Sequence, residues 1–146
     1  MDAKEFLSRP EELAQELDDA KQKVAALKAR AERHGIAFGP EAIHVTHSRN
    51  MTAMEETIIS LAEAREEEAR LTEAFMNAAL EVGLVIDRVP EMVLRQFLEK
   101  RYLEFMTVIG TAEAMGHSER WGRQKHREAL EAVQEILDSE SGSGFA

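Results

Sequence analysis

Apolar side chains in the first part of the chain recur at alternating steps of four and three residues. The positions are Leu13, Leu17, Ala20, Val24, Leu27 and Ala31. A repeat of about 3.5 residues gives a helix one narrow apolar stripe, as in a coiled coil. Ser8 and Glu11 fit the capping pattern S-x-x-E, and Pro10 is tolerated in the first turn of a helix. We therefore expect a helix over residues 9–33, with residues 1–7 frayed.

A second apolar stripe occupies the middle of the chain. Its positions are Met54, Leu61, Ala64, Leu71, Phe75, Ala78 and Val82. Further apolar residues are expected to widen it, namely Ile58, Ile59, Met76 and Leu80. Thr52 and Glu55 form another capping box, which predicts a long helix to about Glu81 that Gly83 bends or ends. Because neither stripe can stay exposed, the two long helices should pair within one chain or across a homodimer.

Residues 34–50 separate the two predicted helices and contain two glycines, one proline and three histidines. The pair His34-Gly35 is typical of a helix end. His44 and His47, with His34 nearby, raise the question of a metal site. No cysteine or acidic cluster accompanies them, so we interpret them as loop histidines and expect no metal or other cofactor.

The segment after the second long helix predicts a shorter helix with a wide apolar face. Residues 87–90 have the composition of a turn, and Pro90 is suited to the first turn of a helix. The apolar positions are Val93, Leu94, Phe97, Leu98, Leu103 and Phe105. We expect this helix to be the first of a three-helix unit.

The next residues have the layout of a helix, a tight turn and a second helix. Thr107 can cap a first helix over residues 108–115, and Gly116 can end it in a left-handed conformation. Ser118 can cap the second helix, which we expect to reach Asp138. Ala112 has the spacing to Gly116 that a helix-turn-helix motif uses. The second helix would present one basic face, formed by Arg120, Arg123, Gln124 and Arg127.

A set of residues in this segment matches a known family. They are Arg101-Tyr102-Leu103, Met106-Thr107, Ala112-Glu113, Met115-Gly116, Ser118-Glu119-Arg120, His126 and Ala129-Leu130. With the long helices before them, they resemble the small phage-encoded transcriptional regulators of the ArpU and RinA type. The C-terminal part of that family is similar to region 4 of sigma factors. The resemblance covers roughly residues 50–138 and implies a regulator that binds double-stranded DNA, with RNA polymerase as a further partner.

The resemblance and the basic face together predict how DNA would be bound. The helix from Ser118 would enter the major groove, with a phosphate held near its N-terminus. Contacts to bases or phosphates would come from Arg120, Arg123, Gln124 and Arg127. Trp121 would either stack on DNA or pack within the protein. Thr111, Gly122 and Lys125 stand where the family usually has isoleucine, valine and leucine, so we expect loose packing around Gly122.

The chain is acidic overall, with 28 Asp and Glu against 18 Lys and Arg and a net charge of −10. Any DNA contact must therefore come from a local patch, and residues 117–128 supply one, with four basic against two acidic side chains. The acidity also favours a second interpretation. The protein would then be an acidic helical adaptor or inhibitor that binds RNA polymerase or a host nucleic-acid enzyme. No cysteine and no catalytic motif is present, so we expect no enzymatic activity.

The composition is rich in helix-forming residues, and we expect an all-α fold. Residues 1–86 would form a long antiparallel helical, coiled-coil-like part with a loop at 34–50. Residues 87–138 would form the helix-turn-helix domain, and residues 139–146 a flexible tail. No signal-peptide pattern and no stretch of ~18 apolar residues is present, so we expect a cytoplasmic protein that does not span a membrane.

Overall fold

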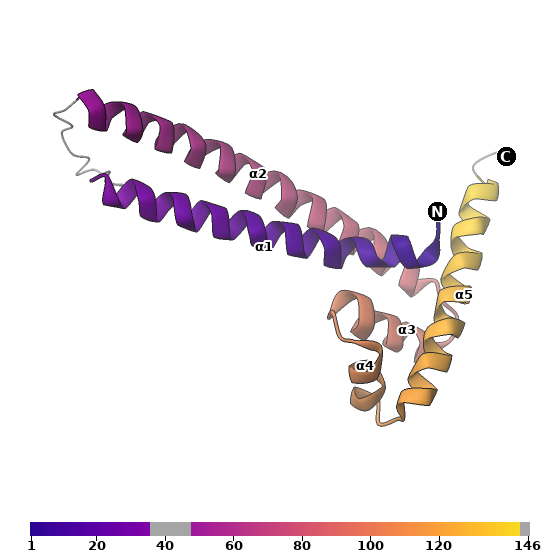
Figure 1. Ribbon diagram of the computed structural model, residues 1–146. Helices are drawn as coiled ribbons and strands as arrows, with labels where there is room; N and C mark the ends of the chain where they lie inside the picture. Colours follow the sequence, from indigo (N-terminus) through magenta and orange to yellow (C-terminus); the bar gives the residue numbers. More distant parts are fainter. Residues whose placement is uncertain (36–47, 144–146) are drawn as a thin grey trace. The chain divides into compact units, whose positions relative to one another are not determined.

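The computed structural model describes residues 1–35 and 48–143, and within these ranges the chain is helical with no strand. The predicted all-α class is confirmed. The helices, labelled in Figure 1, are α1 (Ala3–Arg33), α2 (Ser48–Asp87), α3 (Met92–Leu98), α4 (Val108–Ala114) and α5 (Glu119–Ser143). A short π-helix, η1 (Glu99–Leu103), follows α3 directly. No helix in the described ranges is long and apolar enough to cross a membrane.

The chain forms two compact units, and α1 and α2 each contribute to both. The first unit combines Met1–Ala14 with the chain from Phe75 onward, and the second is Gln15–Ala74. From the sequence we expected a boundary at residue 86. Instead, the first turns of α1 and the last turns of α2 belong to the same unit as the C-terminal helices.

The second unit is built from α1 and α2, whose apolar stripes are covered within the chain. Its buried apolar side chains are Leu17, Ala20, Ala31, Met54, Leu61, Ala64 and Leu71. Residues of both helices line a common cavity, among them Ala20, Leu27 and Ala64. Glu67 lines the same cavity. A hydrogen bond from Arg70 holds the pKa of Glu67 below its usual range, and Lys23 contributes more weakly.

The stripe on α2 is narrower than we expected. Ile58 and Ile59 are 47% and 58% exposed, and Met76 and Leu80 are 62% and 63% exposed. The prediction that these residues widen the buried stripe is therefore wrong. Thr57 is a polar residue within the stripe, yet it is buried. Its burial is tolerated because its hydroxyl donates a hydrogen bond to the Ala53 carbonyl at 2.8 Å. The helix is covered along one side only, and these four apolar residues lie outside that side.

The N-terminal residues of α1 belong to the core of the first unit, so the expected fraying of residues 1–7 is wrong. Ala3, Phe6 and Leu7 are buried, and Pro10 lies buried inside the helix rather than at its start. Burying a large apolar side chain stabilises a fold by about 1.5–3 kcal/mol, which offsets the hydrogen bond that a proline removes. The Ala3 amide also donates to Oε1 of Gln134 on α5 at 2.8 Å.

The core of the first unit gathers side chains from α1, α2, α3, η1 and α5. Its buried members are Ala3, Phe6, Leu7, Val82, Val85, Ile86, Val89, Leu94, Leu98, Tyr102, Ala129 and Val133. They come from segments far apart in sequence, so the core depends on the tertiary arrangement. Val93, which we expected on the apolar face of α3, is 42% exposed.

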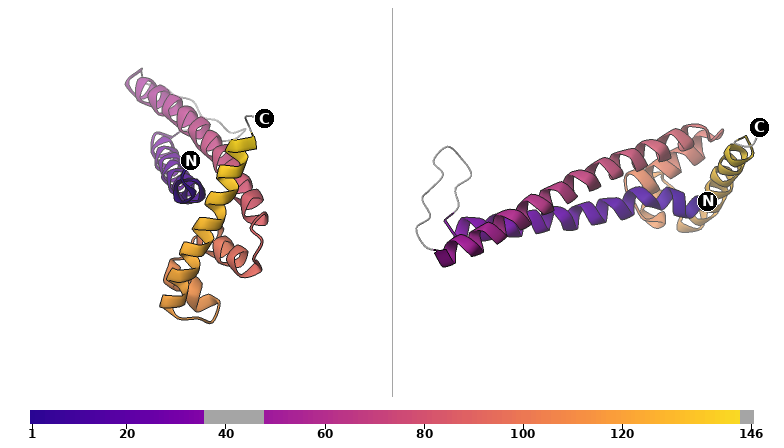
Figure 2. Two further views of the ribbon diagram at one scale, coloured as in Figure 1. Left: turned by 90° about the vertical axis from the view of Figure 1, so that its right-hand side faces the viewer. Right: turned by 90° about the horizontal axis from the view of Figure 1, so that it is seen from above.

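The long helices extend beyond their predicted ends. α2 begins at Ser48, one turn before the predicted cap at Thr52, and continues past Gly83 to Asp87. Figure 2 shows α2 as one continuous helical ribbon. α5 continues to Ser143, so the predicted tail over residues 139–146 begins too early. Glu140, which lies in this extension of α5, forms an ion pair with Arg88, the residue that follows α2. The histidines at positions 44 and 47 lie outside the described residues.

The connection from α3 to α4 departs from regular helix. In η1 the Glu104 amide donates to the Glu99 carbonyl at 2.9 Å, five residues back. Phe105 then adopts a φ of +60°, a left-handed conformation that is strained for a bulky side chain. Its ring packs against Phe75 of α2, with the ring centroids 6.4 Å apart. This sharp change of direction brings Thr107 to the start of α4.

Candidate nucleic-acid interface

Helix α4 begins and ends at the residues that the sequence indicates. The Thr107 hydroxyl accepts a hydrogen bond from the Gly110 amide at 2.9 Å, so Thr107 caps the helix. At the other end Gly116 has a φ of +79°, and the His117 amide donates to the Ala112 carbonyl at 2.9 Å. This pattern satisfies the last carbonyls of a helix through a left-handed residue. Both end signals are confirmed.

Helix α5 starts directly after this turn, as Figure 1 shows. The Trp121 amide donates to the Ser118 hydroxyl at 3.2 Å, so the predicted cap at Ser118 is confirmed. Glu119 follows in the first turn, where a negative charge favours the positive end of the helix dipole. The start of α5 is therefore defined by its own capping residue.

The packing of α4 on α5 is close at Gly122, so our expectation of loose packing there is wrong. A Cβ added to Gly122 would lie 2.7 Å from the Cβ of Ala112 and 3.3 Å from the carbonyl oxygen of Val108. The glycine is therefore what allows the two helices to touch. Thr111 is fully buried, but its hydroxyl donates to the Thr107 carbonyl at 2.8 Å, so it is satisfied. Lys125 forms an ion pair with Glu128 at 3.0 Å.

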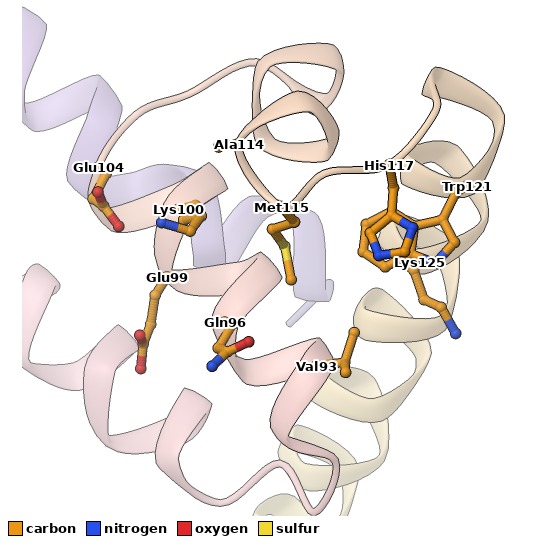
Figure 3. Close-up of a pocket in the computed structure, with 10 residues that line it drawn as sticks. All are labelled: Val93, Gln96, Glu99, Lys100, Glu104, Ala114, Met115, His117, Trp121 and Lys125. Atoms are coloured by element: carbon orange, nitrogen blue, oxygen red, sulfur yellow. The ribbon is translucent and has the colours of Figure 1, made fainter.

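Trp121 packs within the protein. Its ring lies face to face with the His117 ring at a centroid distance of 3.8 Å, as Figure 3 shows. Its edge meets Phe97 of α3 at 6.3 Å. Trp121 also lines a cavity of about 700 Å³, together with Met115, Lys125 and residues of α3 and η1. Because His117 covers one face of the indole, the packing role of Trp121 has structural support that the stacking role on DNA lacks.

The predicted basic face is exposed to solvent. Its residues Arg120, Arg123, Gln124 and Arg127 are all exposed, and so is Ser118 before them. Arg123 forms an ion pair with Glu119 one turn earlier, and the Gln124 amide donates to Glu128 at 3.4 Å. Arg120 has no acidic partner within ion-pair distance among residues 1–35 and 48–143. The structure thus brings the arginines together on one side of α5 and leaves Arg120 available to a ligand.

Charge changes sign along the exposed side of α5. The arginines occupy its first turns, whereas the later turns carry the exposed acidic residues Glu131, Glu135, Asp138 and Glu140. An approaching polyanion would be attracted by the first part of the helix and repelled by the second. Along the described part of α5, a polyanion is therefore attracted to the N-terminal turns rather than to the later ones.

A buried tyrosine fixes a histidine beside this face. The Tyr102 hydroxyl and Nε2 of His126 are 2.5 Å apart, and the two rings stack at a centroid distance of 5.8 Å. Phe97 packs on the same imidazole at 6.0 Å. Burial, with weaker contributions from Arg101 and Lys4, lowers the pKa of His126 from its ordinary value of 6.5. Burial raises the pKa of Tyr102, so the pair is neutral at pH 7.

A groove of about 690 Å³ lies between the start of α4 and the basic side of α5. It is lined by Thr107, Val108, Ile109, Glu119, Arg123, His126 and Arg127. Arg123 and Arg127 are predicted from the sequence to bind a ligand, whereas Thr107, Glu119 and His126 are not. Helical spacing indicates that Glu119, Arg123 and Arg127 share a side, but nothing in the sequence places the start of α4 opposite them.

The described residues contain no group of three or more His, Asp or Glu placed to hold a metal ion.

Comparison of the chain with protein-family models, curated proteins and solved structures finds no match. The interface must therefore be interpreted from its own chemistry. Guanidinium groups on one helix side, two of which line a groove, are suited to binding phosphate and the edges of bases.

Proposed function

We propose that this protein is a phage-type transcription regulator that binds double-stranded DNA through α5. In the fold that this proposal assumes, a long antiparallel helical part precedes a helix-turn-helix unit similar to region 4 of sigma factors. α4 would be the first helix of the motif and α5 the helix that enters the major groove. The protein would act in the cytoplasm, with RNA polymerase as a further partner.

One observation carries the proposal, namely the exposed arginine face on the first turns of a helix that is packed tightly on α4. A helix that reads bases must be held rigidly, because its side chains need a fixed position relative to base edges. The close approach of α4 and α5 at Gly122 supplies that rigidity. Arg120, Arg123 and Arg127 supply charge and the fork-shaped donors that pair with guanine or phosphate.

The charge pattern also sets how the protein would dock. The acidic later turns of α5 must stay away from DNA, so the helix would enter the groove by its N-terminal end. Few phosphates can be neutralised by so small a patch, and each contributes about 0.9 to the slope of log affinity against log salt. Affinity would be modest for one motif and would rise when two motifs act together in a homodimer.

A selection of duplexes from a random library, followed by fluorescence anisotropy at low and moderate salt, tests this function. We expect an enriched sequence and its loss in the double variant Arg120→Glu/Arg123→Glu. The matched control is Lys21→Glu/Lys28→Glu, which makes the same change in net charge at exposed positions of the second unit. Circular dichroism checks that both variants keep their helix content. Unchanged DNA binding in the folded arginine variant would exclude α5 as the reading helix.

A second candidate function is an acidic helical adaptor that binds a protein partner. It is favoured by three large apolar side chains at four-residue steps on α2, namely Met76, Leu80 and Leu84, which are all more than half exposed. Exposed apolar clusters of this kind mark protein contacts more often than chance. If the selection enriches no duplex at any salt concentration, this function replaces the first. Crosslinking to purified RNA polymerase would then be the decisive measurement.

A further inference from the structure

The groove between α4 and α5 has the donors of an anion site. Arg123 and Arg127 line it from α5, and Thr107 lines it from the residue before α4. Glu119 lines it as well and is the ion-pair partner of Arg123. Two guanidinium groups against one carboxylate leave the groove with a positive excess, which an anion would balance.

His126 adds a third donor that is held in a fixed orientation. Its ring is stacked on Tyr102, packed against Phe97 and engaged at Nε2 by the Tyr102 hydroxyl. When Tyr102 donates to Nε2, the hydrogen of the neutral ring is on Nδ1, the nitrogen left for a ligand. A ring fixed in this way loses little freedom when it binds a further group.

We propose that this groove binds one phosphate group, with Arg123 and Arg127 as charged donors and His126 as the third donor. On binding, Arg123 would exchange Glu119 for the phosphate. The inference rests on the proposed function for the source of the phosphate, which is the DNA backbone. The same chemistry would accept free inorganic phosphate, and the experiment separates the two sources.

The site makes phosphate binding depend on the charge of His126. A bound anion favours the protonated imidazole, so binding would take up a proton and become tighter as pH falls. The charged and titratable groups around the ring are Lys4, Tyr102 and Arg101 on the core side, and Glu119, Arg123 and Arg127 along the groove. Burial, with weaker contributions from Arg101 and Lys4, favours the neutral form of His126, and a bound anion would favour the protonated form.

The first measurement is the affinity of the full chain for its selected duplex between pH 7.5 and pH 5.5. Affinity should rise as pH falls, by about tenfold for each unit by which the phosphate raises the His126 pKa. His126→Phe keeps an aromatic ring and should remove most of this rise. His117→Gln, which changes another imidazole outside the groove, should retain it. The double variant Tyr102→Phe/His126→Phe avoids leaving the buried hydroxyl without a partner and should behave like His126→Phe.

The second measurement needs no DNA. The NMR pH titration of the His126 ring, assigned by its absence in His126→Phe, is recorded with and without inorganic phosphate. An upward shift of its pKa in wild type that is lost in Arg123→Glu/Arg127→Glu supports the site. If the affinity for the duplex depends on pH equally in wild type and His126→Phe, this inference is wrong, while the proposed function is unaffected. If no duplex binds, a His126 titration that inorganic phosphate does not alter overturns it as well.

Discussion

Gly122 of α5 lies so close to Ala112 of α4 that a Cβ on Gly122 would be 2.7 Å from the Cβ of Ala112. The neighbouring Val108 carbonyl oxygen would be at 3.3 Å, and Ala112 is fully buried. Neither group is the end of a flexible side chain, so a larger residue at position 122 would move a helix. This contact sets the geometry of α4 relative to α5.

Gly122→Val should therefore destabilise the first unit. Overpacking a well-filled contact costs about 1–3 kcal/mol, which exceeds the gain of less than about 1 kcal/mol from replacing a helical glycine. Urea unfolding followed by circular dichroism measures the change. A variant as stable as wild type would show that α4 can move away without cost.

Gly83→Ala is the matched control, because a Cβ at Gly83 meets nothing within 4 Å. Here only the helix propensity of α2 changes. We expect a gain of up to about 1 kcal/mol in the free energy of unfolding. A loss at this position would mean that α2 needs the flexibility of glycine there.

Leu7→Ala should be strongly destabilising, although Leu7 lies in a segment that the sequence pattern leaves outside any helix. Leu7 is fully buried in the core of the first unit. Truncating a buried leucine costs about 2–5 kcal/mol. Leu84→Ala is the control, since that side chain is 59% exposed and should change stability by less than about 0.5 kcal/mol. Equal effects of the two substitutions in urea unfolding would contradict the core assignment.

The stability of the first unit should fall as pH drops below about 6.5. Burial lowers the pKa of His126 in the folded state, so below the ordinary value of 6.5 the unfolded chain binds a proton that the folded chain does not. The loss stops growing once pH passes below the folded pKa. Its size is about 1.4 kcal/mol for each unit by which the pKa is lowered. Urea midpoints at pH 7.5, 6.5 and 5.5 measure it.

The double variant Tyr102→Phe/His126→Phe is the control for this pH dependence. It removes the titrating group together with the hydroxyl that would otherwise lose its partner. Its urea midpoint should change little between pH 7.5 and pH 5.5. A slope equal to that of wild type would assign the effect to other groups.

Glu119→Gln should strengthen DNA binding if α5 is the reading helix. The substitution releases Arg123 from its ion pair and removes a negative charge from the groove. An exposed ion pair is worth up to about 1 kcal/mol, so affinity should rise by up to about fivefold. Glu131→Gln, farther along α5, should have a smaller effect. Anisotropy titrations with the selected duplex compare the two variants, and a weaker Glu119→Gln complex would count against the docking proposed here.

Local signals in the sequence were sufficient to predict both ends of α4 and the start of α5. Thr107, Gly116 and Ser118 each act through a hydrogen bond or a backbone angle within a few residues, so the cap or turn that each forms does not depend on distant parts of the chain. The same holds for the exposed arginine face, because residues three and four apart share a side of any helix. The all-α class follows equally from composition and spacing.

Only the tertiary structure decided what each helix packs against. The prediction that residues 1–7 are frayed was wrong, because Phe6 and Leu7 pack in a core formed with α2, α3 and α5. No local sequence pattern reveals this core. The prediction that Ile58 and Met76 belong to the buried stripe was wrong for the converse reason. No part of the described chain covers their side of α2.

The candidate site likewise combines features that follow from the sequence with features that depend on the tertiary structure. Periodicity alone places Arg120, Arg123 and Arg127 on one side of a helix. The contact of Gly122 with Ala112 and that of His126 with Tyr102 join residues that are 10 and 24 positions apart in sequence. Such contacts depend on the distance between helices rather than on the repeat within one. The direction in which α5 presents its arginines was therefore determined by the packing of α4 and η1, while their presence on one face was determined by the sequence itself.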